Sequence, residues 1–182
     1  MIKTFFSTLL YKWMGWKKEI SFDFPSKYII CLAPHTSNWD FVIGQLFAKA
    51  EGIQSNFLMK KEWFVWPLGI LFKKLGGIPV ERSKHTSMTD RMADFAIKSE
   101  RFGLCITPEG TRKPTKDWKK GFYFIALKAN LPILLFGVDY EKKLIKATKI
   151  IIPNGDIEAQ IAEIKSYFKD FKGKIPDNFM YE

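Results

Sequence analysis

Two short polar motifs carry the residue types that could do chemistry in this chain. The first is HTSNWD, from His35 to Asp40, and the second is EGTR, from Glu109 to Arg112. A histidine titrates near neutral pH and can take a proton from a hydroxyl, while a nearby carboxylate can hold its Nδ1–H. An arginine presents a planar set of N–H donors that matches a phosphate. The two motifs therefore indicate proton transfer beside an anion-binding group.

Each motif also has a purely structural interpretation. Glu109 can hold the guanidinium of Arg112, and Gly110 can let backbone N–H groups approach an anion, but the same residues suit a structural salt bridge in a tight turn. A His five residues before an Asp is equally compatible with a helix-capping loop. Taken singly, neither motif decides between the two interpretations.

The elements around the motifs favour the chemical interpretation. An apolar run precedes each motif directly, YIICLAP in the first case and FGLCITP in the second. These runs predict buried strands at 27–33 and 103–107, and helices are predicted at 39–50 and 118–129. Because parallel strands deliver polar loops to one edge of a sheet, we expect the two motifs to lie close together.

The remaining pattern completes a single α/β domain, with a mixed and mostly parallel sheet flanked by helices. No internal repeat or low-complexity linker interrupts it. The other predicted elements are strands at 19–24, 55–59 and 133–138, one or two edge strands in KLIKATKIII at 143–152, short helices in 62–75, and helices at 2–17, 86–101 and 157–171.

The first predicted helix is amphipathic. Its apolar face, at helical spacing, consists of Ile2, Phe5, Phe6, Leu9, Trp13 and Trp16. Such a face with tryptophan and flanking lysine can lie in a lipid headgroup layer, or it can pack on the core of the domain. No stretch of the chain approaches the roughly 20 apolar residues that a membrane-spanning helix needs.

The composition points to an anionic partner. The net charge is +10 with a pI of about 9.5, and aromatic residues make up 16% of the chain. Nucleic acid, an anionic membrane surface and phosphorylated small molecules all fit this charge. Most aromatic residues lie in apolar runs and no nucleic-acid-binding signature is present, so we expect no nucleic-acid partner.

The cysteines and histidines give no metal-binding pattern. Cys31 and Cys105 each lie inside an apolar run, which is typical of small buried side chains and fits a reducing compartment. The second histidine, His85, is expected at the surface. With two His and no ligand spacing, neither a metal nor a resident cofactor is predicted.

Beyond these local patterns, the chain resembles a known family. HTSNWD is similar to the His-x4-Asp block of the glycerolipid acyltransferases, the PlsC-like superfamily that includes 1-acyl-glycerol-3-phosphate acyltransferases. Four further segments resemble blocks of that family in the right order: MKKEWF at 59–64, GGIPVER at 76–82, TPEGTR at 107–112 and LPILLFGVDY at 131–140.

The resemblance implies transfer of a fatty acyl group from acyl-CoA or acyl carrier protein to a hydroxyl of a lysophospholipid-type acceptor, in membrane lipid biosynthesis. His35 would be the general base and Asp40 would orient it, with no acyl-enzyme. The residues that would bind the acceptor's anionic group are Glu109, Gly110, Thr111 and Arg112, with Arg82 and Lys61 at further matching positions.

The residue pattern and the charge also indicate where the protein would work. Residues 1–18 would form a membrane-surface helix and residues 19–182 the acyltransferase domain, bound peripherally to the anionic cytoplasmic face of a membrane. The apolar segment 62–75 would line an acyl-chain groove or contact the membrane, or it would belong to the ordinary core.

Two alternatives stay open. Glu81 beside Arg82 departs from the family's second block, so a non-glycerol acceptor such as an aminolipid precursor is compatible with the sequence. A non-catalytic lipid-surface or carrier-binding module with the same fold is the other.

Overall fold

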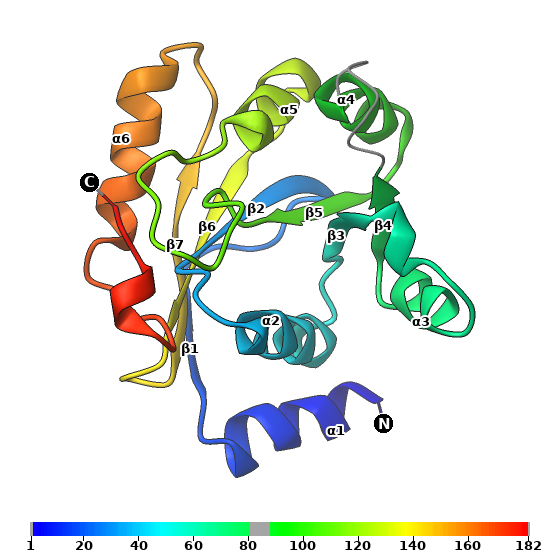
Figure 1. Cartoon of the computed structure of the whole chain (residues 1–182), viewed down its shortest axis with the longest axis vertical. Helices are drawn as coiled ribbons and strands as arrows, with labels where there is room; N and C mark the ends of the chain where they lie inside the picture. The colour runs from blue at the N-terminus through cyan, green and yellow to red at the C-terminus, as the bar shows by residue number, and fades with distance from the viewer. Residues whose placement is uncertain (1, 81–87, 182) are drawn as a thin grey trace.

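A seven-stranded sheet forms the middle layer of the molecule (Figure 1). The computed structural model describes residues 2–80 and 88–181. The strands follow the order β1-β7-β6-β2-β5-β3-β4 across the sheet. They are β1 (Lys17–Ile20), β2 (Lys27–Ala33), β3 (Asn56–Lys60), β4 (Gly77–Val80), β5 (Phe102–Ile106), β6 (Ile133–Asp139) and β7 (Leu144–Ile151).

The sheet is mixed and mostly parallel, as the sequence predicts. The five strands β6, β2, β5, β3 and β4 run in one direction. Strand β7 is antiparallel to β6, and β1 is parallel to β7. The prediction of edge strands at 143–152 was wrong, because β1 pairs with the outer side of β7 and makes it a single inner strand.

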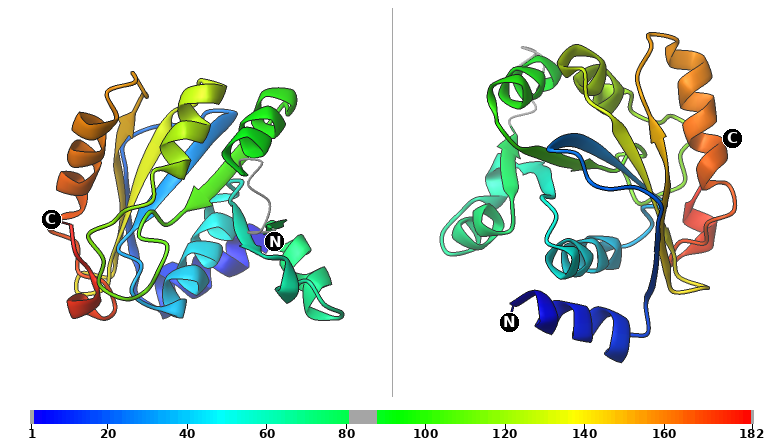
Figure 2. Two further views of the ribbon diagram at one scale, coloured as in Figure 1. Left: turned by 45° about the horizontal axis from the view of Figure 1, so that its top comes forward. Right: turned by 180° about the vertical axis from the view of Figure 1, so that it is seen from behind.

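Helices cover both faces of the sheet (Figures 1 and 2). Two of them, α1 and α2, lie on one face, while α4, α5 and α6 lie on the other, and α3 lies beyond β4. The α-helices are α1 (Ile2–Ser7), α2 (Asn38–Glu51), α3 (Leu68–Lys74), α4 (Met88–Lys98), α5 (Gly121–Ala129) and α6 (Ile157–Phe168); η1 (Thr8–Trp13) is a π-helix, and η2 (Lys61–Trp63) and η3 (Pro176–Asn178) are 3-10 helices.

The central strand β2 explains why the core has two parts. Successive side chains of a strand point to opposite faces. Ile29, Cys31 and Ala33 pack against α4, α5 and α6, while Ile30 and Leu32 pack against α2 and the N-terminal segment. An uninterrupted apolar run is therefore needed here, since both faces of this strand are buried.

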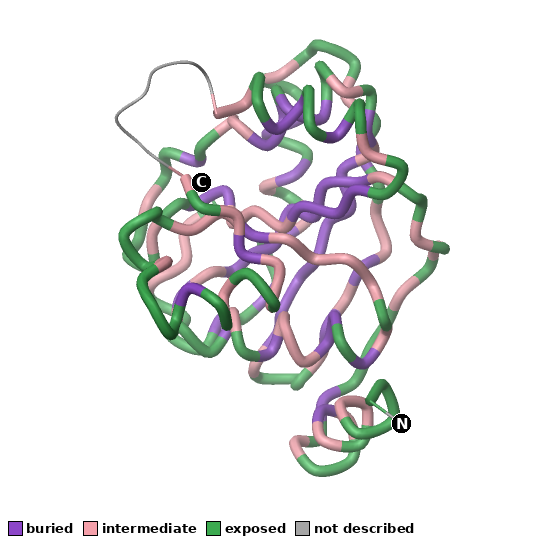
Figure 3. Tube along the Cα trace, turned by 90° about the vertical axis from the view of Figure 1, so that its right-hand side faces the viewer, coloured by how far each residue is buried: buried purple, intermediate pink, exposed green. Residues whose placement is uncertain are grey.

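The N-terminal segment differs from the predicted helix at 2–17. The helical part ends at Trp13, and Gly15, with φ +72, turns the chain towards β1. Leu10 and Trp16 are buried against β2, α2 and β6, so the segment packs on the domain. Figure 3 shows much of the remaining N-terminal segment as exposed.

The segment 62–75 is not ordinary core. Six large apolar side chains there are exposed: Trp63, Val65, Trp66, Leu68, Ile70 and Leu71. Phe95 of α4 is also 51% exposed, while Met92 of the same helix is buried. Among the described residues, no helix is both long and apolar enough to cross a membrane.

Candidate active site

His35 and Asp40 meet at the carboxyl end of β2. The strand ends at Ala33, and α2 begins five residues later, so one sharp loop brings the two side chains together. His35 Nδ1 lies 3.2 Å from Asp40 Oδ2, a close contact that is not aligned as a hydrogen bond. Catalytic contacts in unliganded sites are often loose in this way and tighten with substrate.

Asp40 also caps the helix that carries it. Its Oδ2 accepts hydrogen bonds from the backbone N–H groups of Thr36, at 2.7 Å, and Ser37, at 2.8 Å. The side chain of Ser37 accepts from the N–H of Trp39 in return, which makes a capping box. The capping and chemical interpretations are therefore compatible, because a single buried carboxylate makes both sets of contacts.

Glu109 contacts the same loop from the end of β5. Its Oε1 accepts a hydrogen bond of 2.8 Å from the backbone N–H of His35, and the side chain is buried. Burial raises the pKa of Glu109 to about 7, although the hydrogen bond from His35 opposes the rise. The prediction that Glu109 holds the guanidinium of Arg112 was wrong, because the buried carboxylate binds the loop of His35 and its Oε2 has no hydrogen-bond partner among the described residues.

Arg112 is bound by the other motif instead. Its Nη1 donates a hydrogen bond to Oδ1 of Asn38, the first residue of α2. Both side chains are exposed, so the rest of the guanidinium faces solvent at the N-terminus of that helix. Sequence reasoning did not identify Asn38, because a contact between two separate motifs leaves no signal in local spacing.

Gly110 and Thr111 shape the turn between Glu109 and Arg112. Gly110 has φ +64, a conformation that favours glycine, and its N–H donates to the carbonyl of Thr107 at 3.1 Å. That N–H is engaged within the turn and is not free for an anion. Oγ1 of Thr111 accepts from the N–H of Lys113 at 3.2 Å.

Lys61 and Arg82 are the two predicted anion-binding residues outside the two motifs. Lys61 is exposed and begins η2 immediately after β3. Strand β5 separates β3 from β2, and neighbouring strands lie about 4.8 Å apart, so the ends of β2 and β3 are roughly 10 Å apart at the same edge of the sheet. Arg82 lies outside the described residues.

The two thiols are poorly suited to nucleophilic chemistry. Burial raises the pKa of Cys105 to about 12 and that of Cys31 well above its usual range. Both side chains are therefore protonated at neutral pH. In the described part of the chain, no group of three His, Cys, Asp or Glu side chains could hold a metal ion.

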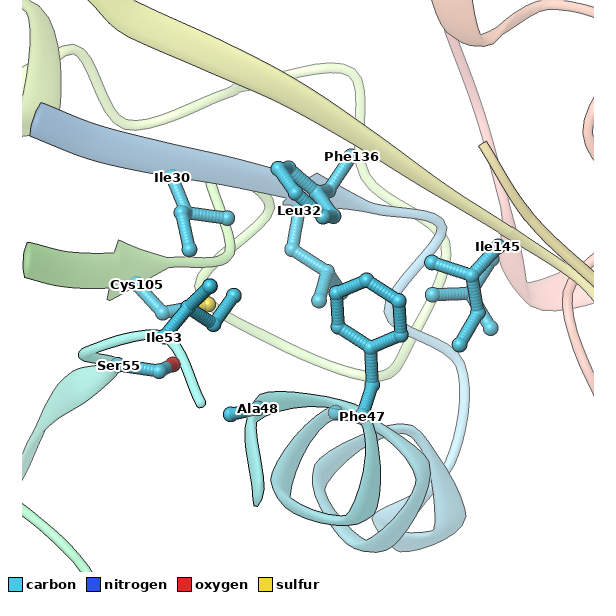
Figure 4. A pocket seen from close by; sticks show the side chains of 11 residues that line it. Ile30, Leu32, Phe47, Ala48, Ile53, Ser55, Cys105, Phe136 and Ile145 are labelled. Carbon is cyan, nitrogen blue, oxygen red and sulfur yellow. The ribbon is translucent and has the colours of Figure 1, made fainter. Parts of the chain in front are cut away.

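An apolar pocket lies between α2 and the sheet (Figure 4). Its walls come from β2, α2, β6 and neighbouring segments, and include Ile30, Leu32, Phe47, Ile53 and Phe136. Leu32 is three residues before His35, so the pocket begins close to the loop that carries the histidine. Nothing in the sequence indicated this small pocket, and the acyl-chain groove or membrane contact expected of 62–75 stays a prediction.

The fold carries a His–Asp pair beside an arginine at the carboxyl edge of the sheet, an arrangement suited to acyl transfer. Comparison of the chain with known protein families identifies the same class. The model of the acyltransferase family matches residues 17–138, and the chain belongs to that family. It is therefore an acyltransferase enzyme. A search of curated protein sequences found no significant match.

One solved structure is similar over nearly the whole chain. It is the 1-acyl-sn-glycerophosphate (LPA) acyltransferase PlsC from Thermotoga maritima, with a TM-score of 0.64 and 17% sequence identity. The match covers 92% of this chain and 75% of the Thermotoga maritima chain. At this identity the likeness establishes the fold, and the fold class predicted from the sequence is confirmed.

Proposed function

We propose that the enzyme transfers a fatty acyl group from acyl-CoA or acyl carrier protein to a hydroxyl of a lysophospholipid such as 1-acyl-glycerol-3-phosphate, in membrane lipid biosynthesis. The observation that carries the proposal is the contact between His35 Nδ1 and Asp40 Oδ2 at 3.2 Å, with Arg112 bound to Asn38 at the start of the same helix. A base and an anion-binding group are thus available to one acceptor molecule.

His35 acts as the general base in this proposal. The acceptor oxygen bonds to the thioester carbonyl carbon while its proton passes to Nε2 of His35. The carbon–sulfur bond then breaks with its electron pair on sulfur, and the thiolate takes the proton from His35. Asp40 stabilises the imidazolium between these two steps. No covalent acyl-enzyme forms, which is consistent with the raised pKa values of Cys31 and Cys105.

Arg112 binds the phosphate of the acceptor. The remaining N–H donors of its guanidinium and the N-terminus of α2 both favour an anion at this edge. Fixing the phosphate holds the hydroxyl near His35, and such positioning supplies much of the rate of an acyl transfer. Lys61, directly after β3, would add positive charge at this edge, and the resemblance assigns the same role to Arg82.

The acyl chain and the membrane are assigned to apolar surfaces. We propose that the acyl chain lies along the apolar residues of segment 62–75, since the pocket under α2, with a volume of about 30 Å³, is too small for one. We propose that exposed apolar residues of α1, η1 and segment 62–75 contact an anionic membrane at its cytoplasmic face. They include Phe5, Trp13 and Trp66, with the exposed lysines Lys12 and Lys73 nearby in the chain.

The proposal is tested by measuring acyl transfer from palmitoyl-CoA and palmitoyl carrier protein to lysophosphatidic acid, lysophosphatidylcholine and an aminolipid precursor. We expect product with lysophosphatidic acid, no product with His35→Ala, and weaker acceptor binding with Arg112→Ala. Arg101→Ala is the matched control, since Arg101 precedes β5 at the opposite edge of the sheet.

Two results would overturn this assignment. Product only with the aminolipid precursor would assign a different acceptor to the same chemistry. Equal activity of wild type and His35→Ala would favour the non-catalytic lipid-binding module.

A further inference from the structure

The two oxygens of the Asp40 carboxylate have different surroundings. Oδ2 accepts from the N–H groups of Thr36 and Ser37 and lies next to His35 Nδ1. Oδ1 is completely buried, and no aligned hydrogen-bond partner is found for it among the described residues. A buried carboxylate oxygen without a donor is costly, so the groups facing Oδ1 matter.

Tyr140, directly after β6, provides the group next to this carboxylate. Its Oη is also buried and lacks an aligned partner within the described chain. Burial raises the pKa of Tyr140 well above its usual range, and its side-chain contact with Asp40 raises that pKa further. The phenol therefore stays protonated and can only act as a donor towards the carboxylate.

The position of Tyr140 is set from three sides. Its backbone N–H donates to the carbonyl of Lys172 at 2.8 Å. Its ring packs edge-on against Trp16, with centroids 5.1 Å apart, and Nζ of Lys174 lies 5.6 Å from its centroid. The N-terminal and C-terminal segments thus hold this ring, so little conformational freedom is lost when the phenol donates to Asp40.

We propose that Tyr140 is a positioning residue of the active site, donating a hydrogen bond to Oδ1 of Asp40 and thereby acting on His35. The proposal rests on the proposed function for its kinetic consequence. A donor on Oδ1 fixes the plane of the carboxylate so that Oδ2 faces His35 Nδ1. It also draws charge away from Oδ2, which limits how strongly Asp40 stabilises the protonated imidazole.

Other charged groups around the pair are common to every variant compared. Glu109 approaches His35 and Asp40 from the end of β5, and Lys174 lies over the ring of Tyr140 from the C-terminal segment. Neither group is changed when the hydroxyl of Tyr140 is replaced by hydrogen in Tyr140→Phe. A difference between wild type and Tyr140→Phe therefore reports the phenol.

The first test compares Tyr140→Phe with Tyr11→Phe. Tyr11 is a matched control, because its Oη donates to Glu51 Oε1 at 2.5 Å, far along the chain from His35. We expect Tyr140→Phe to lower kcat/KM about tenfold, as for loss of a hydrogen bond to a charged group. We expect the acid-side midpoint of its pH profile to move to higher pH, whereas Tyr11→Phe leaves that midpoint in place.

The second test needs no substrate. The chain has two histidines, and a His85→Gln variant assigns their imidazole NMR signals. In Tyr140→Phe the midpoint of the His35 signals is expected to move to a pH higher by about half a unit. The reason is that a carboxylate without the hydrogen bond from Tyr140 carries more negative charge next to the imidazolium and so favours it. Replacing Tyr140 by 3-fluorotyrosine strengthens the donor without a change of fold, and the midpoint then moves to lower pH.

The outcomes separate the two proposals. A shifted His35 midpoint in proteins that transfer no acyl group, wild type included, supports the contact and rejects the proposed function. If the His35 midpoint is unshifted in both Tyr140→Phe and the fluorotyrosine protein, the inference is overturned, whatever the effect on rate. A tyrosine with only a structural role would lower stability without moving this midpoint.

Discussion

The carboxylate of Glu109 accepts a hydrogen bond of 2.8 Å from the backbone N–H of His35 and so joins the ends of β5 and β2. Two motifs separated by more than seventy residues in the chain are thereby held together by one buried side chain. The pair places the histidine relative to the turn that carries Arg112. Several properties of the protein depend on this arrangement.

The pH dependence of stability is expected to reflect Glu109. Its pKa is raised to about 7 in the folded protein, so the protonated form is favoured by folding. The resulting stability is fully present below the unfolded pKa, near 4.3, and is lost as pH rises through 7. The difference across this range is on the order of 3 kcal/mol.

Glu109→Gln, which imitates the protonated carboxyl group, should remove this pH dependence. We expect its free energy of unfolding in urea to fall less than that of wild type between pH 5 and pH 7.5. Glu100→Gln, at an exposed glutamate, serves as the control. Identical slopes for wild type and Glu109→Gln would show that Glu109 titrates at its ordinary pH.

Asp40→Asn should separate capping from chemistry. The asparagine oxygen can still accept from Thr36 and Ser37, so the thermal midpoint is expected to change little. A neutral amide cannot stabilise the imidazolium, so kcat is expected to fall about 10²- to 10⁴-fold. Asp170→Asn controls for a surface aspartate. Full activity of Asp40→Asn would remove Asp40 from the mechanism.

Arg112→Ala should raise the KM for a phosphate-bearing acceptor about tenfold or more, because a charge-assisted contact is lost. The KM for an uncharged monoacylglycerol should not change, so the preference between the two acceptors is the informative measurement. Arg112→Lys is expected to recover only part of the preference, since lysine lacks the planar fork. An unchanged preference in Arg112→Ala would place the phosphate elsewhere.

Membrane binding should depend on the exposed tryptophans. Trp13 is 79% exposed and Trp66 is 83% exposed. We expect Trp13→Ser and Trp66→Ser each to weaken sedimentation with phosphatidylglycerol-containing vesicles about tenfold, because burying a large apolar side chain contributes about 1.5–3 kcal/mol. Phe124→Ser, on α5 at the far side of the sheet, is the control. Equal loss in all three would argue against a defined membrane face.

Local sequence patterns determined most of the secondary structure. The run at 27–33 matches β2 residue for residue, and Asp156 caps α6, since its Oδ1 accepts from the N–H of Ala159. Ser37 caps α2 in the same way, with its side chain accepting from the N–H of Trp39. These features depend on residues close in the chain, whose spacing encodes burial and capping directly. The segments that resemble the family's blocks also predicted the fold and the reaction class.

Only the tertiary structure decided which residues touch. Glu109 turns inward to His35, Arg112 binds Asn38, and the buried Tyr140 interacts electrostatically with Asp40. The tertiary structure also leaves six large apolar side chains of 62–75 exposed, whereas Leu10 is buried. The catalytic and binding roles assigned to these residues stay predictions. Periodicity reports how apolar a face is, but long-range packing determines what covers that face, and that information does not reside in any local stretch of sequence.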